Sequence, residues 1–325
     1  MRLENLCRLL NGILLNNPAI SEINEFGFDA KAIKRGYAFF SNDSNEDDIS
    51  QAINNGAYAI IATKIDSIQD KEIAYIKVED IRLSVIRLVR FMASEKSLVF
   101  YHINKIQKSI ISNIHIKNAK LLPNRIDEIF KVIQNANFNE IFFSDDIEIL
   151  NQLSPNYQST ALTKNIETIN SNSMFFVNFI FDEIFYQNIN IPQIFLKDLC
   201  SLLETLSGNN IHFKLNEIKS LDHFEPIFID KNFYPVSFGT SFRAIIVEND
   251  IELFKLEANY LANKFDQSDI IITASKDTKL DIENIVYFKK LDDIKSFKNF
   301  RYVLMLCNKE ELMERLNEKE EATLF

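Results

Sequence analysis

The sequence predicts an α/β protein built from more than one domain. Short apolar runs of strand length alternate with stretches whose apolar residues recur with a helical period, and this alternation is typical of helices layered on sheets. At 325 residues the chain is long enough for two or three domains. Hydrophobic residues make up 46% of it and charged residues 25%, so it can bury sizeable cores.

Residues 1–96 show the alternation clearly. Leu3, Leu6 and Leu10 follow a helical period among charged neighbours, which predicts an amphipathic helix and not a signal peptide. Asp80 stands at the N-cap position of a helix whose apolar stripe reaches Met92. Strands are expected at residues 38–41, 58–62 and 74–78, and a further helix has its core at residues 49–54.

The rest of the chain divides into two blocks. Residues 93–97 are polar and mark a first boundary, and a last block begins near Pro226. In the middle block, strands are expected at residues 98–101, 140–144 and 174–180, helices at 125–135 and 195–206, and loops and turns at 152–173. In the last block, buried strands of the parallel type are expected at residues 244–248, 270–273, 285–288 and 302–306, with a helix over 254–265 and another that Asn308 starts.

Composition excludes several classes of function. A net charge of −10 argues against a nucleic-acid partner and against docking on anionic lipid, and no apolar run is long enough for membrane insertion. Cys7, Cys200 and Cys307 offer no disulfide framework, which fits a reducing cytoplasm. The four histidines have no zinc-like spacing, so no metal site is expected.

One segment carries a family resemblance. Residues 27–62 read GFDAKAIKRGYAFFSNDSNEDDISQAINNGAYAIIA, and the sequence IKVED at residues 76–80 precedes an apolar helix. This pattern is similar to the N-terminal domain of the Mur ligases, which build peptidoglycan precursors with ATP. In the family the pattern is Asp-Ser-Arg, Gly, a strand, Ala-x-x-x-Gly-Ala and a strand of Val and Ile.

The resemblance implies a binding site for the uridine diphosphate of a sugar-peptide. Asp29, Ala30 and Lys31 stand where the family has Asp-Ser-Arg, so a hydroxyl donor is missing and the lysine cannot make bidentate contacts. Asp29 and Lys31 are therefore the candidate ligand-binding residues. The alternative is that both merely cap a turn before Gly36.

The nucleotide loop of the family would follow the strand at residues 98–101. Lys108 and Ser109 align with its Lys-Thr, but Asn104 and Gln107 replace glycines that let backbone N–H groups crowd the phosphates. The chain has only six glycines, and no two of them are close enough for an intact phosphate loop. ATP and magnesium are therefore not expected as cofactors, and the sequence identifies no other.

The remaining resemblance is short. Residues 223–226 (HFEP) and 244–250 (AIIVEND) are similar to the end of the central domain and the start of the C-terminal domain of the family. The family's magnesium ligands, its carbamylated lysine and its C-terminal arginine motifs have no counterpart. The expected architecture is thus a Mur-ligase-like α/β domain at residues 1–96, a reduced central domain with a degenerate P-loop at 97–225, and a Rossmann-like domain at 226–325.

Three functions remain open at this point. The first is a non-catalytic cytoplasmic protein that binds a UDP-N-acetylmuramoyl-peptide or a cell-wall enzyme. The second is an active amide ligase whose unorthodox nucleotide site uses Lys108 and Ser109. The third is a scaffold that binds no small ligand. No catalytic residue is assigned, because the spacing of the sequence singles out no nucleophile or general base.

Overall fold

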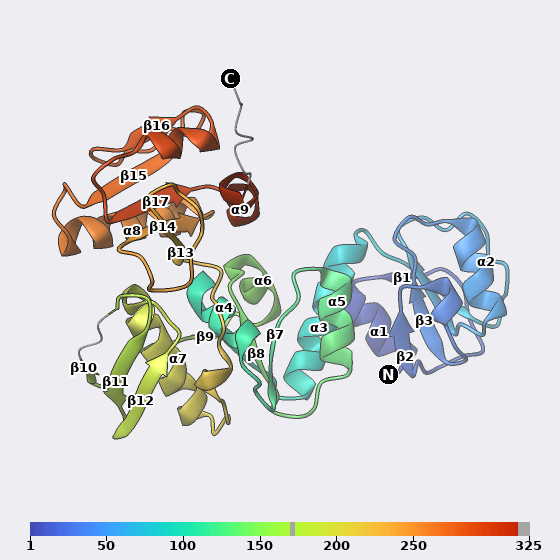
Figure 1. Cartoon of the computed structure of the whole chain (residues 1–325). Helices are drawn as coiled ribbons and strands as arrows, with labels where there is room; N and C mark the ends of the chain where they lie inside the picture. The colour runs from blue at the N-terminus through green and yellow to red at the C-terminus, as the bar shows by residue number, and fades with distance from the viewer. Residues whose placement is uncertain (170–172, 318–325) are drawn as a thin grey trace. The chain divides into compact units, whose positions relative to one another are not determined.

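A computed structural model describes residues 1–169 and 173–317. Its contacts divide the chain into two compact units. Figure 1 labels the helices and strands of both units. Unit 1 contains residues 1–103 and 118–159, and unit 2 contains residues 104–117 and 160–325. This division differs from the three predicted domains, because residues 97–225 are shared between the two units, and the predicted boundaries stay a prediction.

Unit 1 contains two sheets. The first has the strand order β1-β5-β4-β3-β2, in which only the β1–β5 pair is antiparallel. The second has the order β7-β8-β6-β9 and is parallel throughout. The strands are β1 (Ile13–Leu14), β2 (Glu25–Gly27), β3 (Tyr37–Phe40), β4 (Ala59–Ala62), β5 (Ala74–Lys77), β6 (Val99–His102), β7 (Ala119–Leu121), β8 (Ile141–Ser144) and β9 (Gln158–Ser159).

The two sheets of unit 1 share one layer of helices. A single buried cluster joins Phe40 of the first sheet, Leu88 and Phe130 of the helices, and Phe142 of the second sheet. Helix α3 packs against α1, α5 and α6, and Figure 1 shows α3 and α5 side by side. Helix α2 belongs to a separate cluster on the other face of the first sheet. The helices are α1 (Leu3–Leu10), α2 (Glu46–Asn54), α3 (Ile81–Glu95), α5 (Ile126–Gln134) and α6 (Ile147–Leu153), with a 3₁₀ turn η1 (Ala30–Ala32).

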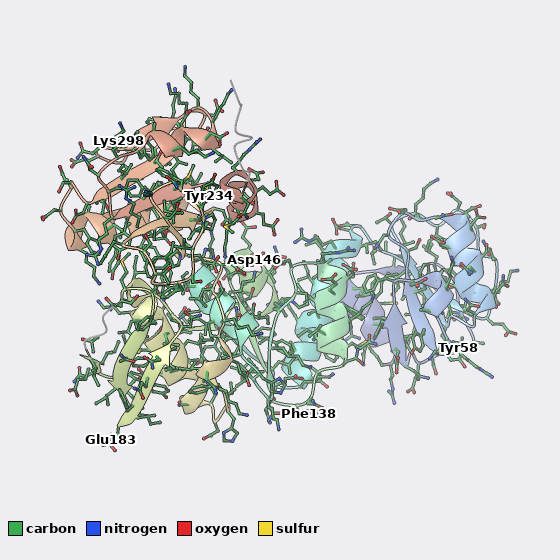
Figure 2. All side chains as sticks on the ribbon, viewed as in Figure 1. Tyr58, Phe138, Asp146, Glu183, Tyr234 and Lys298 are labelled. Atoms are coloured by element: carbon green, nitrogen blue, oxygen red, sulfur yellow. The ribbon has the colours of Figure 1, made fainter. Side chains whose placement is uncertain are left out.

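Helix starts in unit 1 follow from local capping chemistry. The carboxylate of Asp80 accepts a hydrogen bond from the backbone N–H of Leu83 at 2.8 Å, as the sequence predicts. Asp146, labelled in Figure 2, does the same for Ile149 at 2.9 Å and starts α6, a helix that the sequence analysis did not predict.

Unit 2 contains an antiparallel sheet and a mostly parallel one. The first has the order β10-β11-β12 and a tight turn at Asp182 and Glu183, whose tip is labelled in Figure 2. The second has the order β13-β14-β17-β15-β16, in which only the β13–β14 pair is antiparallel. The strands are β10 (Ile166–Ile169), β11 (Val177–Phe181), β12 (Ile184–Ile189), β13 (Glu225–Ile229), β14 (Arg243–Glu248), β15 (Ile270–Ser275), β16 (Val286–Phe288) and β17 (Tyr302–Leu306).

The helices of unit 2 cover these sheets. Helix α8 contacts β14, β15 and β17, and a separate buried cluster joins Val303 of the parallel sheet to Ile294 of η4 and Leu312 of α9. Helix α4 packs on α7. The helices are α4 (Lys105–Asn113), α7 (Leu196–Gly208), α8 (Ile251–Lys264) and α9 (Lys309–Asn317), with 3₁₀ turns η2 (Gln193–Phe195), η3 (Leu215–Glu217) and η4 (Leu291–Ser296).

The α/β class is confirmed, and one local prediction is wrong. Strands β9 and β10 both lie within residues 152–173, for which only loops and turns were expected, and residues 170–172 of that segment lie outside the described part of the chain. Three of the four residues of β10 are exposed, so the strand lacks the apolar alternation that marks a strand in a sequence. Backbone pairing with β11 defines it instead.

Candidate functional site

A cavity of about 580 Å³ lies at the carboxyl edge of the first sheet of unit 1. Asn42, Thr63 and Glu79, which follow β3, β4 and β5, all line it. Residues from the first two turns of α3 and α5, together with Phe28 and Asp29, complete the lining. The carboxyl edge of a parallel sheet is where α/β proteins bind their ligands, because loops and helix starts converge there.

Three basic side chains line this N-terminal cavity. Arg82 and Lys131 are exposed, and neither forms a hydrogen bond or ion pair through its side chain within residues 1–169 and 173–317. Arg125 is paired with Asp127 through two bonds of 3.1 Å each. Among the described residues, Arg82 and Lys131 are therefore unpaired cations, and they share the cavity with the carboxylates of Asp29, Glu79, Asp80 and Asp127.

The two helix starts at the cavity differ. Asp80 satisfies one N–H group in the first turn of α3. Helix α5 has no such cap, because the side chain of Arg125, its N-cap residue, makes no capping hydrogen bond. An uncapped helix start presents several backbone N–H groups and a partial positive charge, which together favour an anion.

The structure places Asp29 and Lys31 at η1, next to this cavity. The Asp29 carboxylate accepts a hydrogen bond from the backbone N–H of Lys31 at 2.9 Å, so it does cap a turn. Asp29 also lines the N-terminal cavity, whereas Lys31 is exposed and is not among the lining residues. Turn capping and ligand contact are therefore compatible for Asp29.

The start of α4, where the family has its phosphate loop, is filled by the chain's own side chains. The Asn104 side chain accepts a hydrogen bond from the backbone N–H of Gln107 at 2.9 Å. The Gln107 side chain accepts one from the backbone N–H of Asn104 at 3.0 Å. This is a capping box, and it uses backbone donors that a phosphate group would need.

Gln107 is held in place by hydrogen bonds to helix α7. It is 2% exposed, and its amide nitrogen donates to the hydroxyl of Ser201 at 2.7 Å and to the carbonyl of Asp198 at 3.1 Å. The amide of Asn104 donates to the Asp198 carboxylate at 2.7 Å. Burial raises the pKa of Asp198, and the bond from Asn104 partly offsets that effect. A ligand phosphate would have to displace this whole network.

The residues aligned with the family's Lys-Thr lie one turn further along α4. The hydroxyl of Ser109 donates to the carbonyl of Leu221 at 2.6 Å, so its proton is already engaged. Lys108 is half-buried on the same helix. Lys105, at the first position of α4, forms an ion pair with Asp250.

A buried acidic pair lies near the carboxyl end of β14. The Glu248 carboxylate accepts hydrogen bonds from His223 at 3.0 Å and from the backbone N–H of Asp250 at 2.8 Å. Burial alone would lower the pKa of His223, but the hydrogen bond to Glu248 and the nearby charges of Glu248, Asp250 and Asp222 together raise it. Glu257 is fully buried, and its carboxyl oxygens have no hydrogen-bond partner among the described residues. Burial, reinforced by Glu248, raises the pKa of Glu257 to about 11.

Neither a group of metal ligands nor a membrane-spanning helix occurs among the described residues. Within residues 1–169 and 173–317, no three His, Cys, Asp or Glu side chains are grouped so that they could hold a metal ion. Across that same part of the chain, every helix is too short or too polar to cross a lipid bilayer.

Comparison with known proteins gives no sequence match but a structural one. Neither a protein-family model nor a curated protein matches the sequence. The crystal structure of MurF ligase from Thermotoga maritima in complex with ADP aligns with a TM-score of 0.52, covering 90% of this chain and 96% of that one at 13% identity. The chain has a Mur-ligase-like fold. The D-alanyl-D-alanyl-adding ligase of Acinetobacter baumannii aligns with a TM-score of 0.48 over 98% of both chains at 9% identity.

The Mur-ligase-like fold confirms the family resemblance that the sequence predicted. The sequence did not single out Arg82, Lys131 or the uncapped start of α5. These groups line one cavity only because the starts of α3 and α5 both lie at the same edge of the sheet. Glu257 left a visible signal, since it shares the helical stripe of Phe254 and Leu261 and is therefore a charged residue on a buried face.

Proposed function

We propose that this protein is a non-catalytic, Mur-ligase-like protein that binds a UDP-N-acetylmuramoyl-peptide in its N-terminal cavity. The observation that carries the proposal is the contrast between two helix starts. The start of α5 is uncapped and opens on a cavity with unpaired cations, whereas the start of α4 is closed by Asn104 and Gln107.

The N-terminal cavity suits a nucleotide-sugar in size, and its lining carries three basic side chains beside the four carboxylates of Asp29, Glu79, Asp80 and Asp127. Its volume of about 580 Å³ falls within the usual range for small-molecule sites. Arg82, Lys131 and the backbone N–H groups at the start of α5 can together balance a pyrophosphate. Asn42 and Thr63 add neutral polar groups that can contact a base or a sugar.

The start of α4 argues against phosphoryl transfer. That reaction needs backbone donors around the β- and γ-phosphates and a hydroxyl on the metal ion. Here the donors of Asn104 and Gln107 are used within the capping box, and the Ser109 hydroxyl bonds to Leu221. An active ligase would need to rebuild this segment before ATP could bind, so we rank that alternative second.

Calorimetric titration with UDP-N-acetylmuramoyl-tripeptide tests the binding step. We expect micromolar binding that Arg82→Met weakens by at least about tenfold, because a charge-assisted hydrogen bond is lost. Arg90→Met is the matched control, since Arg90 is an exposed arginine of the same helix outside the cavity. Equal binding by both variants would contradict the assignment, and no binding by the unaltered protein would favour a scaffold.

A further inference from the structure

A second cavity, of about 560 Å³, lies within unit 2. It is formed by β10 and β11, the start of α7, the end of α8 and the start of β17. Met174, Val177 and Leu196 are buried and give it apolar walls. Its size suits a small organic molecule.

The charges that line this second cavity are all positive. Lys264 and Arg301 are its two ionisable cations, and none of the described residues that line it is acidic. The Lys264 ammonium group donates to the phenol oxygen of Tyr260 at 2.7 Å and to the side-chain oxygen of Gln193. The Gln193 amide is neutral by nature. Tyr260 is neutral because burial raises the pKa of its phenol to about 12.

Arg301 is held by aromatic rings and not by a carboxylate. Its guanidinium carbon lies 5.5 Å from the ring centre of Phe265 and 5.2 Å from that of Tyr302. The backbone N–H groups of Arg301 and Tyr302 both donate to the carbonyl of Asp269, at 2.8 and 3.0 Å, which fixes the chain at this point. Cation–π contacts orient the guanidinium but leave its N–H groups available to an anion.

The cavity therefore has an excess of positive charge in a chain whose net charge is −10. Within residues 1–169 and 173–317, neither Lys264 nor Arg301 forms an ion pair. The carboxyl end of α8 supplies only about half a negative charge, which does not balance two cations. Burial lowers the pKa of Lys264, as expected for a cation that lacks a carboxylate partner.

We propose that this second cavity binds a small dianion carried on an apolar or planar body. Lys264 and Arg301 would each contact the dianionic group, with the Arg301 fork binding two of its oxygens. Met174, Val177 and Leu196 would pack against the apolar body. A monoanion would leave one cation unbalanced, so a phosphomonoester or a dicarboxylate fits this chemistry best. The inference is independent of the proposed function, because the two cavities share no residue.

Calorimetric titration of the full chain with phenyl phosphate and with phthalate tests the proposal. We expect one of the two compounds to bind at a single site. Binding of phenyl phosphate would identify the ligand class as a phosphomonoester, and binding of phthalate would identify it as a dicarboxylate. Inorganic phosphate should bind at least about tenfold more weakly than phenyl phosphate, because it lacks the apolar body. Lys264→Met and Arg301→Gln should each weaken binding by at least about tenfold.

Three controls make the test specific. Lys255→Met removes a lysine of α8 that pairs with Glu252 outside the cavity, and it should change binding by less than about twofold. Arg82→Met should leave this site intact, because Arg82 lines only the N-terminal cavity. Arg301→Lys keeps the charge without the planar fork and should fall between Arg301→Gln and the unaltered protein. Absence of binding to both probes, or unchanged binding by Lys264→Met, would overturn the proposal.

Discussion

Asn104 and Gln107 close the start of α4 by bonding to each other's backbone, at 2.9 and 3.0 Å. In a phosphate loop these two positions would carry glycine, and the backbone N–H groups would face the ligand. The same substitutions that remove the glycines therefore also supply side chains that satisfy the freed donors. In this chain the segment forms a helix cap, and Gln107 bonds from it to α7.

Removing this cap should cost stability. Asn104→Ala is expected to lower the free energy of unfolding by about 1 kcal/mol, the usual cost of losing an N-cap. Urea unfolding followed by circular dichroism measures it. Asn259→Ala is the matched control, because Asn259 is exposed within α8 and should tolerate alanine. Equal effects of the two substitutions would show that the cap contributes nothing.

Lys108 should be irrelevant to nucleotide turnover. With the donors of the α4 start engaged, we expect no ATP hydrolysis above background, and Lys108→Ala should change nothing. A coupled assay for ADP release, with the precursor and its amine partner present, measures this. Turnover that Lys108→Ala abolishes would establish an active ligase with an unorthodox nucleotide site.

Glu257 should make stability depend on pH. Its pKa is about 11 in the folded chain against an ordinary value of 4.5, so the folded chain binds this proton more tightly than the unfolded chain does. The stability from this proton is complete below the unfolded pKa and is lost as pH rises toward the folded pKa.

Glu257→Met should therefore be more stable than the unaltered protein at pH 8, by at least about 1 kcal/mol, and this advantage should shrink at pH 5. Urea unfolding at the two pH values measures the difference. Glu252→Met provides the control, because Glu252 is an exposed residue of the same helix. A constant difference between the two pH values would contradict the buried-proton account.

Lys31 tests the assignment that came from the family resemblance. It lies on η1 outside the lining of the N-terminal cavity, so its contact with a ligand would be exposed to solvent. We expect Lys31→Ala to weaken precursor binding by only about threefold, which is typical of an exposed charge pair. A larger loss than that of Arg82→Met would place the ligand over η1 instead.

Most of the fold could be predicted because its signals are local. The stripe of α3 and its cap at Asp80 involve residues within a few positions of each other. Strand β10 was missed because three of its four residues are exposed, so that only its pairing with the next strand, β11, defines it. The N-terminal cavity was not predicted because it also depends on contacts between separate elements. Arg82 and Lys131 line one cavity only because α3 packs against α5. The absence of glycine at positions 104 and 107 was visible in the sequence, but the capping box that Asn104 and Gln107 form was not predicted.

The proposed function requires that the protein bind the precursor without using ATP. A calorimetric titration with UDP-N-acetylmuramoyl-tripeptide, run without and then with magnesium and ATP, measures this. We expect the same micromolar affinity in both runs and no continuing heat from turnover. Binding that appears or tightens only with ATP, or a steady heat of reaction, would contradict it.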